Sequence, residues 1–179
     1  MQHDIPAKIT DIDAITPGSK LALVTFHGNA PKDITYATFA TTHTPANSTA
    51  PTAITLYHFD DNTFNKPIGD ATYFARLDQD GRITEKGARP NVYAQHGTYV
   101  YDLNHPTTQP FVEWVEHTIE AHDLHRLLTQ RVVELGLHDS TFFTEDLGDV
   151  RQLIDEIIAE DTNAKDAKRT LDEHLAEYR

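Results

Sequence analysis

The sequence contains no cysteine, one methionine and one tryptophan among its 179 residues. The absence of cysteine excludes disulfides, thiolate zinc sites, iron–sulfur clusters and a cysteine nucleophile. Long apolar runs are missing too, because stretches such as LALV at 21–24 are far shorter than the roughly 20 residues that cross a bilayer. The first residues, MQHDIPAK, lack the apolar stretch of a secretory signal. We therefore expect a soluble, cytoplasmic protein.

Positive charge is scarce, with 15 Lys and Arg against 28 Asp and Glu and a net charge of −13. Residues 1–106 hold 8 basic and 11 acidic side chains, whereas 107–179 hold 7 and 17. An acidic chain repels phosphate, so ordinary nucleic-acid binding is disfavoured. The acidity is explained by solubility, by salt adaptation, by a basic partner or by mimicry of DNA charge, and the sequence leaves these four alternatives open.

Glycine-rich and nucleophile motifs are also lacking. HGNAPK at 27–32 has neither the glycine spacing of a dinucleotide site nor the glycine–lysine pair of a P-loop. No GxSxG elbow occurs, and the only serines are Ser19, Ser48 and Ser140. These observations argue against nucleotide binding by those routes and against a serine nucleophile.

The first half of the chain has the short, alternating segments of β-strands, separated by turn signals such as TPGS and DQDG. Hydrophobic residues make up 39% of the sequence, which is enough for a core. The predicted strands are 21–26, 34–41, 53–59, 72–77, 82–84 and 98–103. We expect five to six mostly antiparallel strands that form a meander or a small open barrel.

After Pro110 the hydrophobic period changes from two to 3.6, which predicts helices. The apolar side swings between 111–119 and 124–135, so either one long helix packs on two sides in turn or two helices break near His122–Asp123. Gly136 is a natural helix end and Thr144 a natural N-cap for a second helix. A weaker amphipathic segment covers 163–179.

Strands followed by helices predict an α+β fold, with three to four C-terminal helices packed on the sheet. A doubly wound parallel fold is disfavoured because it requires strands and helices to alternate. We expect a single domain, 1–179, with a β-rich layer at 1–106 and a helical layer at 107–179.

The segment DQDGRITE at 78–85 partly resembles a calcium loop. If Gly81 takes the sixth loop position, however, Arg76 and Gly87 fall at the two anchor positions, where acidic ligands are needed. The same residues are typical of a β-hairpin with an Asp-Gly turn, which is the structure we predict.

Several histidines lie near strand ends and are candidate metal ligands. In a meander, alternate strand ends share an edge, so His27 and His58 could meet and form a facial triad with Asp60 or Asp61. The alternative is that polar residues at strand ends simply meet water, and this is the interpretation we favour.

The segment EWVEHTIEAHDLHRLL, 113–128, holds a second candidate set. Glu113, His117 and Glu120 are spaced four and three apart, so they share one helix face and could bind a divalent metal. The alternative, which we favour, is that these three and Glu116 form the solvated face. His122 falls on the apolar side and is predicted to be buried.

No cofactor is predicted, and the sequence favours a small acidic interaction or regulatory protein over an enzyme. It would bind a protein partner, for which a basic surface is one option, or associate with itself. The first alternative is a metal-dependent enzyme with His and carboxylate ligands. The second is a small-molecule binder with a pocket between sheet and helices.

Overall fold

A computed structural model describes residues 6–44, 46, 53–59, 61–78, 80–84, 96–135, 147–160 and 163–176. The chain forms two compact units, Met1–His117 and Thr118–Arg179, which we call the sheet unit and the helical unit. The boundary between them falls inside a helix. A single domain with layers at 1–106 and 107–179 stays a prediction.

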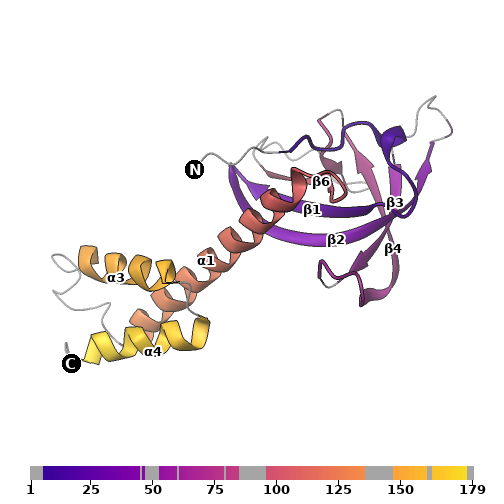
Figure 1. Cartoon of the computed structure of the whole chain (residues 1–179). Helices are drawn as coiled ribbons and strands as arrows, with labels where there is room; N and C mark the ends of the chain where they lie inside the picture. Colours follow the sequence, from indigo (N-terminus) through magenta and orange to yellow (C-terminus); the bar gives the residue numbers. More distant parts are fainter. Residues whose placement is uncertain are drawn as a thin grey trace. The chain divides into compact units, whose positions relative to one another are not determined.

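The sheet unit contains a six-stranded antiparallel sheet with the order β5-β4-β3-β2-β1-β6 (Figure 1). Its strands are β1 (Lys20–His27), β2 (Ala30–His43), β3 (Ala53–Phe59), β4 (Pro67–Leu77), β5 (Ile83–Thr84) and β6 (His96–Asp102). The first five strands form a meander, and β6 returns to pair with β1. All six predicted strands are present, which confirms the α+β prediction.

One face of the sheet forms the main core because apolar side chains recur at every second residue of the strands. On β1, Leu21 and Leu23 belong to this core, whereas Ala22 and Val24 are buried on the opposite face. Before β1, a short 3-10 helix, η1 (Ile12–Ala14), adds Ile12. The buried members of the core are Ile12, Leu21, Leu23, Ala37, Phe39, Ile54, Leu56, Leu77 and Val100.

The sheet is open rather than closed into a barrel. Within the described residues, the chain beside β5 meets β6 at one isolated bridge, between Arg82 and Tyr99. Gly97 lies beside this bridge, and a Cβ atom there would come within 2.7 Å of the Arg82 side chain. The meander of β1 to β5 is one of the two predicted arrangements, a meander or a small open barrel.

The segment at 78–84 forms the predicted hairpin. Leu77 pairs with Ile83 in antiparallel register, and Gly81 adopts a positive φ of 76° that favours glycine. The Asp78 carboxylate accepts hydrogen bonds from the backbone N–H groups of Asp80 and Arg82. Arg82 also pairs with Asp78 at 3.2 Å, so these side chains organise a turn.

Helix α1 (Thr108–Glu134) begins in the sheet unit, next to β6 (Figure 1). The Phe111 ring packs on Tyr101 with centroids 4.7 Å apart. Val112 and Val115 are buried on the same part of the helix. This segment of α1 is therefore fixed by an apolar stripe, as its sequence period predicts.

The helical unit contains the rest of α1 together with α3 (Leu147–Ala159) and α4 (Ala164–Leu175). Their buried side chains form a second core of Leu128, Val132, Ile154, Ile157, Ala167, Leu171 and Leu175. Asn163 caps α4 by accepting hydrogen bonds from the backbone N–H groups of Lys165 and Asp166. The predicted caps Gly136 and Thr144 lie outside the described residues.

Helix α1 is continuous, so the alternative of two helices that break near His122–Asp123 is wrong. Its buried side swings, as the first alternative predicts: Phe111 and Val115 are buried early in the helix, and Leu128 and Val132 later. His122 was predicted to be buried but is exposed. It lies past His117, where the sheet unit ends, and it is about 100° around the helix from the later buried side.

In the described part of the chain, no helix combines the length and apolar character that a membrane span requires.

Candidate functional site

A polar contact joins α1 to the sheet within the sheet unit. Tyr36, which is buried in β2, donates a short hydrogen bond from its hydroxyl to the Glu116 carboxylate on α1. Burial raises the pKa of Tyr36 far above its ordinary value, and the hydrogen bond to Glu116 and the charges of Glu116 and Asp61 raise it further. Tyr36 is therefore a neutral donor at physiological pH, which does not suit it to be a base or nucleophile.

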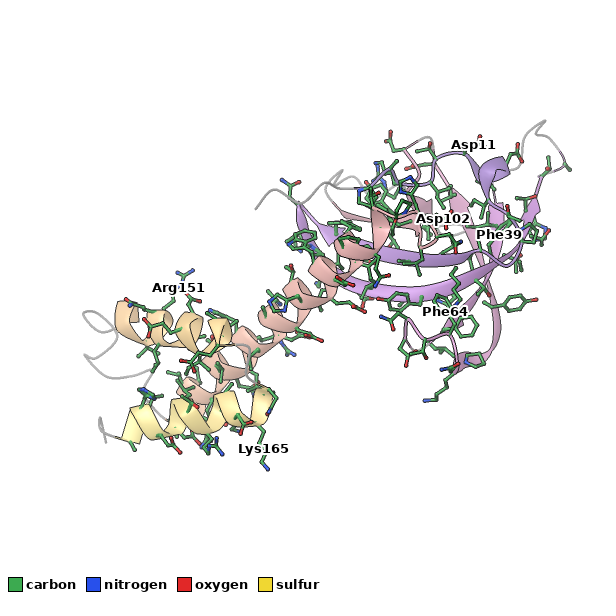
Figure 2. All side chains as sticks on the ribbon, in the orientation of Figure 1. Asp11, Phe39, Phe64, Asp102, Arg151 and Lys165 are labelled. Carbon is green, nitrogen blue, oxygen red and sulfur yellow. The ribbon has the colours of Figure 1, made fainter. Side chains whose placement is uncertain are left out.

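An aromatic cover lies next to this contact. The Phe64 ring packs against Tyr36 and Phe59, with centroid distances of 6.0 and 5.2 Å. The Lys20 ammonium group lies 4.7 Å from the centroid of the Phe64 ring. Phe64 lies on the loop between β3 and β4 (Figure 2). The cover packs on the ring of Tyr36, which is 4% exposed, and favours a structural role for this residue.

The backbone of Phe64 is strained, because its φ of 59° lies in the left-handed region that bulky residues rarely adopt. Asp61 holds the preceding turn by accepting hydrogen bonds from the backbone N–H and the hydroxyl of Thr63. These bonds lower the pKa of Asp61. The strain is thus offset by a local turn and by the ring contacts of the cover.

Sequence reasoning placed Glu116 on the solvated face of α1, and that assignment is wrong. Glu116 is partly buried against the sheet by its bond with Tyr36, which is 80 positions away in the sequence. No local pattern signals such a distant partner. The apolar neighbour Val115 shows only that this side of the helix is close to the core.

The three residues of the predicted helical metal set, Glu113, His117 and Glu120, are exposed. Glu113 accepts a hydrogen bond from Gln109 Nε2 at 3.1 Å, within its own helix. His117 and Glu120 are exposed as well. Their exposure is what the solvated-face interpretation predicts, and a role in metal binding stays a prediction.

The two histidines of the predicted strand-end set, His27 and His58, do not come together. His58 pairs in register with Ala37 of β2, whereas His27 pairs with Ala30 of the same strand. Seven residues of β2 separate these positions, which corresponds to about 23 Å of extended chain. His27 is exposed and His58 is partly buried, and burial lowers the pKa of His58. The geometry does not bring this predicted pair of ligands together.

Among the residues that the structure describes, no three His, Asp or Glu side chains are grouped so that they could hold a metal ion. The divalent metal therefore stays a prediction without a site in the described part of the chain.

In the helical unit, the best-defined polar contact joins α1 to α4. Arg131 donates to both carboxylate oxygens of Asp172, at 2.8 and 2.9 Å, and also pairs with Glu134 at 3.2 Å. The hydrogen bonds to Asp172 and then Glu134 raise the pKa of Arg131 further above its ordinary value. A planar two-bond contact of this kind fixes the orientation of both side chains.

Two other arginines of the helical unit lie beside carboxylates of the same helix. Arg126 lies 3.7 Å from Asp123, and Arg169 lies 3.2 Å from Asp166 and 3.9 Å from Glu173. Residues 118–179 hold 7 basic and 15 acidic side chains, so a large negative excess remains after this pairing. Figure 2 shows two of the basic side chains, Arg151 on α3 and Lys165 on α4, pointing away from the unit.

Comparison of the chain with protein-family models, curated proteins and solved structures gave no match.

Proposed function

We propose that this chain is a non-enzymatic, cytoplasmic interaction protein whose helical unit binds a basic protein partner. The observation that carries the proposal is the charge of the helical unit, in which acidic residues outnumber basic ones about two to one. That unit has an apolar core of its own, so its acidic side chains lie on a defined surface. Such a surface speeds the encounter with a positively charged partner.

The polar contacts support binding over catalysis. The most perturbed tyrosine, Tyr36, is covered by Phe64 and bonded to Glu116, so it is not poised to transfer a proton. The Arg131–Asp172 pair joins two helices and orients them. Both contacts have a structural use. In the part of the chain that the structure describes, no specific observation favours the enzyme alternative or the small-molecule alternative.

Affinity capture tests the proposal. The purified chain is immobilised, and extracts of the cells that produce it are applied at low and at high salt. The comparison variant neutralises exposed carboxylates of the helical unit, namely Glu120, Asp123, Asp155, Glu156 and Glu160. We expect one basic partner that the wild-type chain retains at low salt and releases at high salt, and that the neutralised variant does not retain.

The captured partner is then purified and mixed with the chain, and light scattering after size exclusion should show a complex of fixed stoichiometry. The proposal fails if the chain retains no partner at low salt, or if neutralisation leaves the retention of the partner unchanged.

A further inference from the structure

The turn between β4 and β5 contains the only Asp-Gly pair of the sequence, Asp80 and Gly81, and the sequence has no Asn-Gly pair. The side chain of Asp80 is 72% exposed. Gly81 has no side chain that would shield its backbone nitrogen, and its φ of 76° lies in the region that glycine adopts readily. An accessible carboxyl group therefore precedes an unhindered amide, which is the combination that favours attack of the amide on the carboxyl group.

This attack rearranges the backbone without an oxidant or a reductant. The Gly81 nitrogen forms a bond to Cγ of Asp80 and loses its proton, while the carboxyl group loses its hydroxyl, so that water leaves and a cyclic imide forms. Water then adds to either imide carbonyl carbon. Addition at Cγ restores aspartate. Addition at the original peptide carbon breaks its bond to nitrogen and gives isoaspartate, whose backbone is longer by a methylene group.

Hydrogen bonds of the closed turn hold the Gly81 nitrogen in place. Its N–H donates to the Asp78 carbonyl oxygen at 3.0 Å, and Gly81 is buried. The Asp78 carboxylate accepts hydrogen bonds from the backbone N–H groups of Asp80 and Arg82, both at 2.9 Å. Because the nitrogen must lose its proton and approach the Asp80 carboxyl group, we expect the reaction to proceed from an opened form of the turn.

The isomerised turn does not fit its place in the sheet unit. Gly81 lies against the N-terminal segment, since a Cβ atom at this position would come within 2.5 Å of the Ile9 carbonyl oxygen. Arg82 forms a bridge with Tyr99 of β6, and its carbonyl oxygen accepts a hydrogen bond from the Asp78 N–H at 2.9 Å. A methylene group added between Asp78 and Arg82 must therefore displace Ile9 or break these pairings.

We infer that Asp80–Gly81 is a site of isoaspartate formation, that the closed turn restrains the reaction, and that the product separates the turn from Ile9 and from β6. This inference does not depend on the proposed function. As long as Asp80 keeps its normal linkage, an opened turn can close again. After isomerisation it cannot close in the same way, so a transient opening becomes a lasting change of the sheet unit.

The test compares the folded chain with a synthetic peptide that has the sequence of residues 76–84 and no folded turn. Both are kept in the same mildly acidic buffer, and isoaspartate at position 80 is measured by electron-transfer fragmentation in a mass spectrometer. We expect the peptide to isomerise at least about tenfold faster than the folded chain. Hydrogen exchange of the Gly81 N–H should be slowed in the folded chain by a similar factor, because both reactions need the turn to open.

Two variants that each remove one turn carboxylate separate the role of this turn from that of charge. Asp78→Ala removes the acceptor for Asp80 and Arg82, and it should speed isomerisation by about fivefold or more. Asp61→Ala removes the acceptor for the Thr63 N–H in another loop, and it should change the rate by less than about twofold. Asp80→Glu keeps the charge but requires a larger ring, so it should give almost no isomerised product. Circular dichroism confirms that each variant is folded.

A measurement on the wild-type chain does not rely on the folding of any variant. Urea below the unfolding transition should raise the isomerisation rate and the exchange rate of the Gly81 N–H together. The aged chain is then separated from the fresh chain by ion exchange. In the aged chain, the Ile9 N–H, which donates to the Val100 carbonyl oxygen at 2.8 Å, should exchange faster, whereas amides between β2 and β3 should not change.

Each part of the inference has its own contrary result. Isomerisation of the folded chain at the rate of the peptide, or equal rates for Asp78→Ala and Asp61→Ala, would overturn the restraint by the closed turn. Absence of isoaspartate at position 80 from the peptide as well would overturn the site. Unchanged exchange of the Ile9 N–H in the aged chain would overturn the separation of the turn from its neighbours.

Discussion

Tyr36 of β2 and Glu116 of α1 share a hydrogen bond across 80 positions of sequence, and both side chains lie in the sheet unit. The carboxylate is half-buried, so the bond replaces water that both groups lose on folding. It is a directional contact that fixes the start of α1 on the sheet, and the packing of Phe111 on Tyr101 adds a less directional one.

Removing the donor should destabilise the sheet unit. Tyr36→Phe leaves the Glu116 carboxylate without this bond, and we expect a loss of about 1–3 kcal/mol in the free energy of unfolding. Urea titration followed by the fluorescence of Trp114, the only tryptophan and a neighbour of Phe111, measures this loss. The double variant Tyr36→Phe with Glu116→Leu should lose less than the sum of the single variants. Strict additivity of the two changes would count against the bond.

Alkaline pH should weaken the same unit. An unfolded tyrosine ionises near pH 10, whereas burial and the charge of Tyr99 raise the pKa of Tyr101 to about 12, and the pKa of Tyr36 is raised further. Above pH 10 the unfolded chain therefore binds fewer protons than the folded chain. Each of these tyrosines should lower stability by up to about 1.4 kcal/mol per pH unit, and the contribution of Tyr101 should level off near pH 12.

Urea midpoints between pH 8 and pH 12 check this prediction. Tyr36→Phe should flatten the decline above pH 10, because one of the two ionising groups is gone. An unchanged slope in this variant would show that Tyr36 does not retain its proton in the folded state.

Two glycines with positive φ provide a matched pair. Ala at Gly28 meets no atom within 4 Å, so Gly28→Ala should cost only the conformational penalty of about 1 kcal/mol. At Gly81 the new Cβ atom would lie 2.5 Å from the Ile9 carbonyl oxygen, which is a backbone atom. Gly81→Ala should therefore cost clearly more, about 2 kcal/mol or above, in thermal or urea unfolding. Equal costs would contradict the close approach.

The Arg131–Asp172 pair should stabilise the helical unit through its orientation as well as its charge. Arg131→Lys keeps the charge but loses the two parallel hydrogen bonds, so it should lower the melting temperature measured by circular dichroism. Exchanging the two residues, Arg131→Asp with Asp172→Arg, should recover part of this loss. If Arg131→Lys has the melting temperature of the wild type, the two parallel hydrogen bonds do not contribute to the stability of the helical unit.

Two leucines in the helical unit should differ in their response to truncation. Leu171 is fully buried in the core of this unit, so Leu171→Ala should cost about 2–5 kcal/mol. Leu127 is exposed, and Leu127→Ala should change stability by no more than about 0.5 kcal/mol. Helical circular dichroism against urea measures both values. A large loss for Leu127→Ala would mean that this side chain belongs to the core.

The strands and helices could be predicted from the sequence because their signals are local. Leu21 and Leu23 alternate with smaller residues, and Gly81 follows an acidic turn, so the sheet and its hairpin follow from period and turn chemistry. The burial of individual polar residues could not be predicted. His122 and Glu116 were both misplaced, because their surroundings depend on where α1 leaves one core and enters the next.

The bond between Tyr36 and Glu116 joins segments that no periodicity connects, and the same holds for Arg131 and Asp172. Sequence period identifies the side of a helix that is buried. It does not identify the strand or helix against which this side packs. The partner of a polar residue at the edge of the buried side, such as Glu116, therefore cannot be predicted from the sequence.

The position of β6 beside β1 has a consequence for synthesis on the ribosome. Thr25 and Thr98 hydrogen-bond at 2.8 Å although they are 73 residues apart, and the backbone N–H of Ile9 donates to the Val100 carbonyl. While β2 to β5 emerge and pair, β1 keeps one open edge, and the backbone N–H of Ile9 lacks its acceptor on β6. The strand that is synthesised first, β1, thus receives its second neighbour from the strand that is synthesised last, β6. The sheet unit therefore cannot finish folding until the chain has emerged past Asp102.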